Sequence, residues 1–178
     1  MLLDEFNRAD AASAASVVRV WAAVPDWVDA VVAARPYPST DALTARAAAL
    51  ADAWSVEDLD AALARHPRIG QRPVGAGAEA AASRREQASM TDADAGVTAQ
   101  IAAGNTAYEE RFGRVFLIRA AGRTPEQILA ELRRRLGNDD DAEVAEALGQ
   151  LAEIAILRLR ASVTADFPAG AAGGRIGS

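Results

Sequence analysis

Arg65-His66-Pro67-Arg68-Ile69-Gly70 is the stretch around which the rest of the chain can be ordered. A proline disfavours helical geometry at the residue before it, so the helical run that carries Leu59 and Leu63 has to end at His66 or just before it. His66 is the only histidine in the 178 residues. An imidazole at the junction of a helix and a loop can exchange protons near neutral pH. We therefore take this stretch as one half of a candidate site.

Upstream of this stretch, polar residues and prolines predict the starts of four helices. The first is capped by Asp10 and runs to Trp21, and the second has Pro25 in its first turn. The third begins at Ser39 or Thr40, after Arg35-Pro36-Tyr37-Pro38 has broken the second. The fourth begins at Ser55, with Asp58 three residues later in the manner of a capping box, and leads to His66.

Downstream, the glycines and proline of 70–77 predict a loop, followed by four more helices. The first of them runs from about Glu79 to Met90, and the second is capped by Thr91 and Asp94 and ends at Gly113 after Phe112. The third starts at Thr124-Pro125-Glu126-Gln127 and runs to about Leu136, and the fourth begins with Asn138 and Asp141 and reaches about Thr164. Between the second and third of these helices, Val115-Phe116-Leu117-Ile118 is an apolar run. It is either buried extended chain or a strand too isolated to join a sheet.

The predicted fold class is all-α: a single globular domain of about eight irregularly packed helices. The pattern contains no alternation of strands and helices, no internal repeat and no sustained heptad. We expect the helical domain to cover residues 1–166. The remaining residues, 167–178, are rich in Gly and Ala and are expected to form a flexible tail.

Composition excludes several classes of function. The formal net charge of -6 argues against general nucleic-acid binding. The dense basic run Arg133-Arg134-Arg135 is predicted to be a solvated helix face. The chain has no cysteine, which excludes disulfides and thiol catalysis, and one histidine without cysteine argues against a zinc site. No apolar segment reaches membrane-spanning length and no secretion signal is seen, so we expect a cytoplasmic protein.

Two further groups of polar residues could carry chemistry. Ser83, Glu86 and Gln87 share one face of a predicted helix and would project a hydroxyl, a carboxylate and an amide together. The alternative is an ordinary solvent-facing polar stripe. Arg158 falls on the apolar face of Leu151, Ile154 and Ala155. A cation there either meets an anion or reaches solvent along its aliphatic stem.

A different helical stripe contains Ile101, Asn105, Tyr108 and Phe112, and core packing best explains Tyr108 and Phe112. Asn105 is expected to anchor a loop. With this stripe excluded, the remaining candidate residues supply one imidazole, one carboxylate, one hydroxyl, one amide and at least one arginine. This set suits acid/base work on a small anionic substrate, with no metal and no cofactor. A helical module that only binds a small anion remains an alternative from the residues alone, as does another acid/base lyase or isomerase.

The order and spacing of these residues resemble those of the OHCU decarboxylase family, whose full name is 2-oxo-4-hydroxy-4-carboxy-5-ureidoimidazoline decarboxylase. The resemblance covers roughly Leu2 to Val163. It rests on six blocks in the order of the family: His66-Pro67-Arg68-Ile69-Gly70, Ser83-x-x-Glu86-Gln87, Asn105-x-x-Tyr108-x-x-Arg111-Phe112-Gly113-x-x-Phe116-Leu117-Ile118, Gly122-Arg123, Leu132-x-x-x-Leu136-x-Asn138 and Leu157-Arg158-Leu159.

The resemblance implies an all-α fold, a homodimer, and cofactor-free decarboxylation to (S)-allantoin in urate degradation, with a functional link to a 5-hydroxyisourate hydrolase. By matching position, it implies that His66 and Glu86 are catalytic. The substrate-binding residues that it implies are Pro67, Ser83, Gln87, Arg158 and the segment Phe116, Leu117, Ile118, Arg119 and Ala120, which would offer backbone groups. It implies no metal ligand. Which residue delivers the final proton stays open.

Two positions depart from the family pattern. Gly104 stands where a leucine is usual, and Arg119 stands where a small or apolar residue is common. If Arg119 points inward, it adds a second cation to the site. Arg160 competes with Arg158 for the match, and Arg158 is preferred because it follows Leu157 directly. On this basis the expected enzyme class is a carboxy-lyase. Its alternatives are a small-anion binding module or another cofactor-free lyase or isomerase that acts on a ureido compound.

Overall fold

The structure is a computed structural model, and it describes residues 1–64, 68–71, 77–88, 90 and 93–165. Within that part the chain forms nine α-helices, and its one β-bridge is an isolated pair, Leu2 with Thr164. The helices are α1 (Leu3–Arg8), α2 (Ala11–Trp21), α3 (Pro25–Ala33), α4 (Thr40–Ala51), α5 (Val56–Leu63), α6 (Ala78–Glu86), α7 (Ala95–Phe112), α8 (Pro125–Arg135) and α9 (Asp140–Ser162). The predicted all-α, single-domain fold is confirmed. The tail expected over 167–178 lies outside the described residues.

Most helix starts follow the caps that the sequence predicts. The side chains of Asp10, Ser39, Ser55 and Thr124 each accept a hydrogen bond from a backbone N–H in the first turn. Ser55 with Asp58, and Thr124 with Gln127, form complete capping boxes. At the other end of α7, Gly113 has a φ of 68°, the left-handed conformation that a helix-ending glycine adopts without strain.

Three sequence predictions need correction. A ninth helix, α1, precedes the eight that were expected. Helix α6 ends at Glu86 rather than at Met90, because the chain leaves α geometry at Gln87, whose ψ is 14°. Helix α9 begins at Asp140 with Asp139 as its cap, because the Asn138 side chain donates to Glu143 instead of capping the helix.

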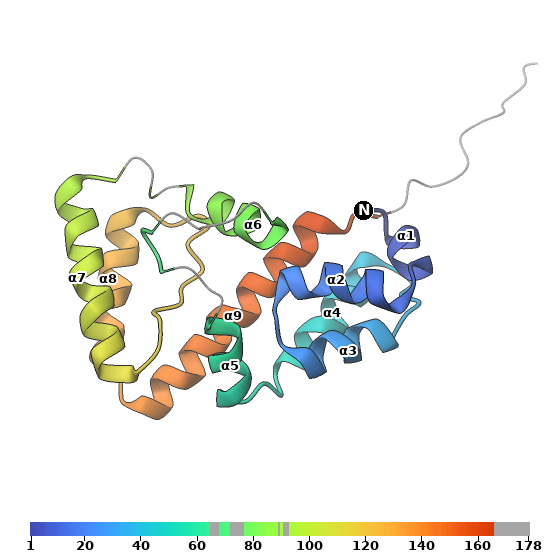
Figure 1. Cartoon of the computed structure of the whole chain (residues 1–178), viewed down its shortest axis with the longest axis horizontal. Coiled ribbons are helices and arrows are strands. Elements are labelled where there is room, and N and C mark those ends of the chain that lie inside the picture. The colour runs from blue at the N-terminus through green and yellow to red at the C-terminus, as the bar shows by residue number, and fades with distance from the viewer. Residues whose placement is uncertain (65–67, 72–76, 89, 91–92, 166–178) are drawn as a thin grey trace, which may run out of the picture.

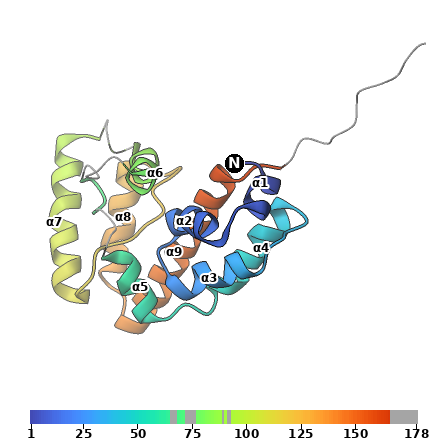
Figure 2. The same cartoon turned by 45° about the vertical axis from the view of Figure 1, so that its right-hand side comes forward.

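Two apolar cores lie on either side of the middle of the molecule (Figures 1 and 2). The first lies among α2, α3, α4, α5 and α9, where the Trp27 ring lies 5.4 Å from Trp54 and 6.4 Å from Trp21. The second lies between α7 and α8, which run side by side at the other end of the molecule. Helix α9 begins near α7 and α8 and runs through the first core toward the N-terminus.

The apolar run after Gly113 passes between these two cores as extended chain. Phe116 and Ile118 belong to the second core, whereas Leu117 between them belongs to the first. Successive side chains of an extended chain point in opposite directions, so one short run can serve both cores. This arrangement explains a strand-like pattern without a sheet. In the described part of the chain, no helix is long and apolar enough to cross a membrane.

Candidate active site

An ion pair between α9 and α6 forms the centre of the candidate site. Arg158, only 5% exposed, donates from Nε to Oε1 of Glu86 at 2.6 Å and from Nη2 to Oε2 at 2.8 Å. Its third nitrogen, Nη1, donates to the carbonyl of Val20 at 3.1 Å. The cation on the apolar face of α9 therefore meets an anion rather than reaching solvent. Because two parallel hydrogen bonds join the groups, a pair of this kind fixes both the orientation and the position of the guanidinium relative to the carboxylate.

Ser83 and Gln87 lie beside this pair. Ser83 is buried one turn before Glu86, and its Oγ accepts a hydrogen bond from Arg158 Nη2 at 3.3 Å. Gln87 follows the end of α6, and its Oε1 accepts from the backbone N–H of Gly70 at 3.0 Å. Since a backbone N–H can only donate, the Gln87 oxygen must face Gly70, and its amide N–H groups remain to donate elsewhere. The three residues predicted to project together do so.

A small cavity joins α6, the apolar run and α9. It has a volume of about 30 Å³, enough for about one water molecule. Its lining includes most of the positions that the sequence singles out: Ser83, Glu86, Gln87, Phe116, Leu117, Ile118 and Ala120, together with Ile69 and Ile154. Residues from four separate parts of the chain thus converge on one place.

A second, more open cavity of about 200 Å³ shares Glu86 with the first and is also lined by Arg158. Its walls come from α2, α6 and α9, and they include Val20, Arg85 and Leu157. Glu86 therefore lies at the border of both cavities. Among the described residues, no group of three or more acidic or histidine side chains is placed to hold a metal ion.

Arg119 does not point toward this site. Its Nε pairs with Glu153 at 2.7 Å and its Nη1 donates to the carbonyl of Ala121, while about a third of the side chain is exposed. Its neighbours Ile118 and Ala120 line the small cavity, whereas the backbone N–H of Arg119 donates to the side chain of Gln150 at 2.9 Å. The second cation that the sequence allowed is thus directed to the surface.

His66 and Pro67 lie outside the described residues, so the structure does not place them. The three residues that follow are each tied to the rest of the molecule. Arg68 forms a two-pronged pair with Glu109, the carbonyl of Ile69 accepts from Asn105 Nδ2 at 3.0 Å, and Gly70 binds Gln87. Asn105, predicted to anchor a loop, is buried and holds this chain segment against α7.

A comparison with protein families matches the OHCU decarboxylase family over residues 7–160. The chain belongs to the OHCU decarboxylase family. Curated relatives named 2-oxo-4-hydroxy-4-carboxy-5-ureidoimidazoline decarboxylase include one from Amia calva and one from Mus musculus. The first is 35% identical over 133 residues, 74% of this chain and 76% of that protein. The second is 32% identical over 132 residues, 73% of this chain and 74% of that protein.

Solved structures share the fold of this family member. The crystal structure of an OHCU decarboxylase in the presence of (S)-allantoin superposes with a TM-score of 0.68 at 23% identity, covering 79% of this chain and 92% of that one. The crystal structure of an (S)-allantoin synthase gives a TM-score of 0.67 at 18% identity, covering 92% of this chain and 54% of that one. Both likenesses concern the fold.

Sequence reasoning missed a buried polar cluster behind the wall of the site. Arg135, expected in a solvated basic run, is 1% exposed, and its partner Glu143 is fully buried. The helical repeat held a usable signal, because Arg135 lies three residues after Leu132 and seven after Ile128, both fully buried. Counting three arginines as one charged run hid the fact that they point in different directions.

Proposed function

We propose that this protein decarboxylates 2-oxo-4-hydroxy-4-carboxy-5-ureidoimidazoline to (S)-allantoin in urate degradation, without a cofactor. The observation that carries the proposal is the grouping of Ser83, Glu86, Gln87 and Arg158 around two cavities that share Glu86, the larger of about 200 Å³ lined by Arg158, in a chain of the OHCU decarboxylase family. These groups supply hydrogen-bond donors, a cation and a carboxylate within a partly apolar pocket. That combination suits a small polar anion.

The chemistry needs few protein groups. The substrate bears a carboxylate and a hydroxyl on one ring carbon, next to the ring carbon that bears the ureido group. When carbon dioxide leaves, the electron pair of the broken bond moves between the two ring carbons, and the adjacent C=N group takes up a proton. The hydroxyl then becomes a carbonyl as it loses its proton, and a proton joins the ureido-bearing carbon from one face. The protein has to orient the substrate, move protons and select that face.

Arg158 and Glu86 are assigned to charge and proton handling. Arg158 binds an anionic or carbonyl oxygen of the substrate, and Glu86 handles protons near the ring. In the structure the two bind each other, so a substrate oxygen that reaches Arg158 competes with the Glu86 carboxylate for its N–H groups. Loosening that pair frees carboxylate oxygens for proton transfer. In this order, the substrate oxygen binds Arg158 first and Glu86 transfers a proton afterwards.

Ser83 and Gln87 are assigned to the ring or the ureido group. Because the Gln87 oxygen is engaged by Gly70, this residue acts as a donor toward a substrate oxygen. Ser83 accepts from Arg158 and keeps its own proton to donate. The backbone of Phe116 to Ala120 forms the facing wall. His66 binds the substrate hydroxyl as base or orienting group, and Pro67 shapes the pocket beside it.

We propose a cytoplasmic homodimer that takes its labile substrate from a 5-hydroxyisourate hydrolase. The reactive region needs no metal in this scheme, because the leaving carboxylate and the adjacent C=N group already provide a path for the electrons.

The test is to generate the substrate in situ from urate and follow its disappearance with and without the protein. Acceleration in proportion to protein concentration is the expected result. Tight binding of allantoin without turnover would instead indicate an anion-binding module. Turnover of other ureido compounds, with none of this one, would indicate a different lyase or isomerase.

A further inference from the structure

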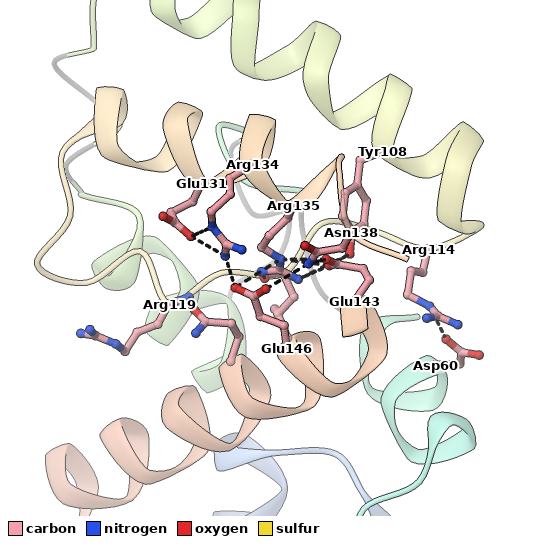
Figure 3. A network of polar contacts seen from close by, with 12 residues as sticks. Asp60, Tyr108, Arg114, Arg119, Glu131, Arg134, Arg135, Asn138, Glu143 and Glu146 are labelled. Carbon is pink, nitrogen blue, oxygen red and sulfur yellow. Dashed lines mark hydrogen bonds and ion pairs between the residues drawn. The ribbon is translucent and has the colours of Figure 1, made fainter. Parts of the chain in front are cut away.

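Arg135 is the most deeply buried cation in the described part of the chain, and it lines neither of the two cavities described above. It is 1% exposed at the end of α8, and the rings of Tyr108 and Phe116 pack against its guanidinium, with Phe116 4.8 Å from its central carbon. Figure 3 shows it at the centre of a cluster that draws on α7, α8 and α9. The function proposed above assigns it no role.

One edge of the guanidinium is held by Glu143. Nε of Arg135 lies 2.9 Å from Oε1 and 3.2 Å from Oε2, and Nη2 also donates to Oε1. The carboxylate is fully buried and is itself fixed by donors from the Tyr108 hydroxyl and from Asn138 Nδ2, the latter at 2.8 Å. The orientation of the guanidinium is therefore set from several sides.

The remaining nitrogen of Arg135 reaches the wall of the site. Nη1 donates to the carbonyl of Leu117 at 2.7 Å. Leu117 and Phe116 both line the cavity that contains Glu86 and Gln87. Among the residues that the structure describes, the extended run has no neighbouring strand to pair with, so side chains take the place of a sheet. Arg135 holds it at Leu117, and Gln150 holds it at the N–H of Arg119.

We propose that Arg135 is a positioning residue for the decarboxylation: oriented by Glu143, it fixes the Phe116–Ala120 wall against which the substrate lies. The inference rests on the proposed function. A planar guanidinium suits the task because its donors diverge at fixed angles, so it can bind the carboxylate and the carbonyl at once. A lysine ammonium carries the same charge without that geometry.

The experiment compares three variants with the unmodified protein. Arg135→Lys keeps the charge. Arg135→Met combined with Glu143→Gln removes both charges and retains an acceptor for Tyr108 and Asn138. Arg134→Met is the matched control, because the neighbouring Arg134 is about half exposed and binds Glu131 and Glu146 rather than the wall. Each variant is measured for its thermal midpoint, for amide hydrogen exchange in the peptide covering 114–123, and for kcat and KM per folded molecule.

For both Arg135 variants we expect hydrogen exchange in 114–123 to speed up at least tenfold. We also expect kcat to fall by roughly 10- to 100-fold, since a misplaced wall disturbs the geometry of the reacting groups. Arg135→Lys should retain more activity than the double variant, and Arg134→Met should match the unmodified protein. An unchanged kcat per folded molecule, or unchanged exchange in 114–123, would overturn the inference. An inactive unmodified protein would refute the proposed function instead, and the exchange measurement would still decide whether Arg135 holds the wall.

Discussion

Arg158 and Glu86, 72 positions apart in the chain, face each other in a two-pronged ion pair at the border of two cavities. The pair joins α9 to α6 and brings the carboxylate predicted to handle protons into contact with the cation predicted to bind the substrate. Removing water from two charges costs free energy that their attraction offsets only when the geometry is good. The Arg158 guanidinium makes two hydrogen bonds to Glu86 and two more, to the Val20 carbonyl and the Ser83 hydroxyl, and this arrangement provides such geometry. The pair is therefore a structural joint between the two helices, and the proposed function also gives it a part in the reaction.

Replacing Glu86 with Gln should reduce both stability and activity. The buried Arg158 would lose its counter-charge, so the free energy of unfolding should fall by about 3 kcal/mol. Loss of a proton-handling group should lower kcat by at least about 100-fold. Urea denaturation and steady-state kinetics check the two effects. Asp60→Asn is the control, because its pair with Arg114 is half exposed on the acid side and should contribute under about 1 kcal/mol. Full activity in Glu86→Gln would refute the role of Glu86.

Gln87→Glu separates the two functions of the Gln87 side chain. A glutamate still offers an oxygen to the N–H of Gly70 but has lost the amide donors. If those donors bind the substrate, KM should rise about tenfold, the equivalent of one hydrogen bond. The added negative charge should also raise KM for an anionic substrate, so a rise in KM alone does not separate the two effects. Unchanged KM and kcat is therefore the decisive outcome, because it would exclude the donor role. Gln87→Met, which also frees Gly70, should lose more.

Gly104, expected from the sequence to depart from the family pattern, lies where α7 and α8 pack closely together. A Cβ atom at Gly104 would lie 2.6 Å from Cδ2 of the fully buried Leu132. Gly104→Leu should therefore destabilise the protein by about 2 kcal/mol through overpacking, despite the better helix propensity of leucine. Leu132→Ala alone should cost about 3 kcal/mol. The double variant should cost clearly less than the two single costs combined, and strict additivity in urea denaturation would contradict this explanation.

Tyr108 makes stability sensitive to alkaline pH. Burial and the hydrogen bond to Glu143 raise the pKa of its phenol. Below pH 10 the phenol is neutral in both states, and above it the unfolded chain ionises while the folded one does not. The free energy of unfolding should thus fall as pH rises past 10, by up to about 1.4 kcal/mol for each pH unit.

Tyr108→Phe should be less stable at pH 8 but should lose stability less steeply between pH 10 and 11. Tyr37, whose pKa is also raised by burial, contributes equally to both proteins and does not affect the comparison. Urea denaturation at each pH provides the slopes. Equal slopes would contradict the assignment of this sensitivity to Tyr108.

Local rules predicted the parts of the fold that local chemistry determines. Capping side chains such as Ser55 and Thr124 are read directly from sequence, because each cap is satisfied within three residues. Helix α1 was missed since it spans only six residues and is held by distant partners, with the N–H of Leu3 donating to the carbonyl of Thr164 at 2.9 Å. Short helices depend on such tertiary contacts.

The sequence likewise predicted only part of the candidate site. Helical spacing placed Ser83, Glu86 and Gln87 together, whereas for Arg158 on its apolar face the sequence left open an anionic partner or an extension to solvent. The identity of that partner, Glu86, required the packing of α9 against α6. The outward turn of Arg119 and the burial of Arg135 depend on neighbours from other helices, Glu153 and Glu143, that no spacing rule connects to them.

Circular dichroism of the allantoin that forms when the substrate is generated in situ from urate provides the sharpest test of the proposed decarboxylation. With enzyme in sufficient excess, uncatalysed decay contributes negligibly. We expect a rapid optical signal of (S)-allantoin with the unmodified protein, and its loss in His66→Ala and Glu86→Ala variants that remain folded. Racemic product, formed no faster than without protein, would contradict it.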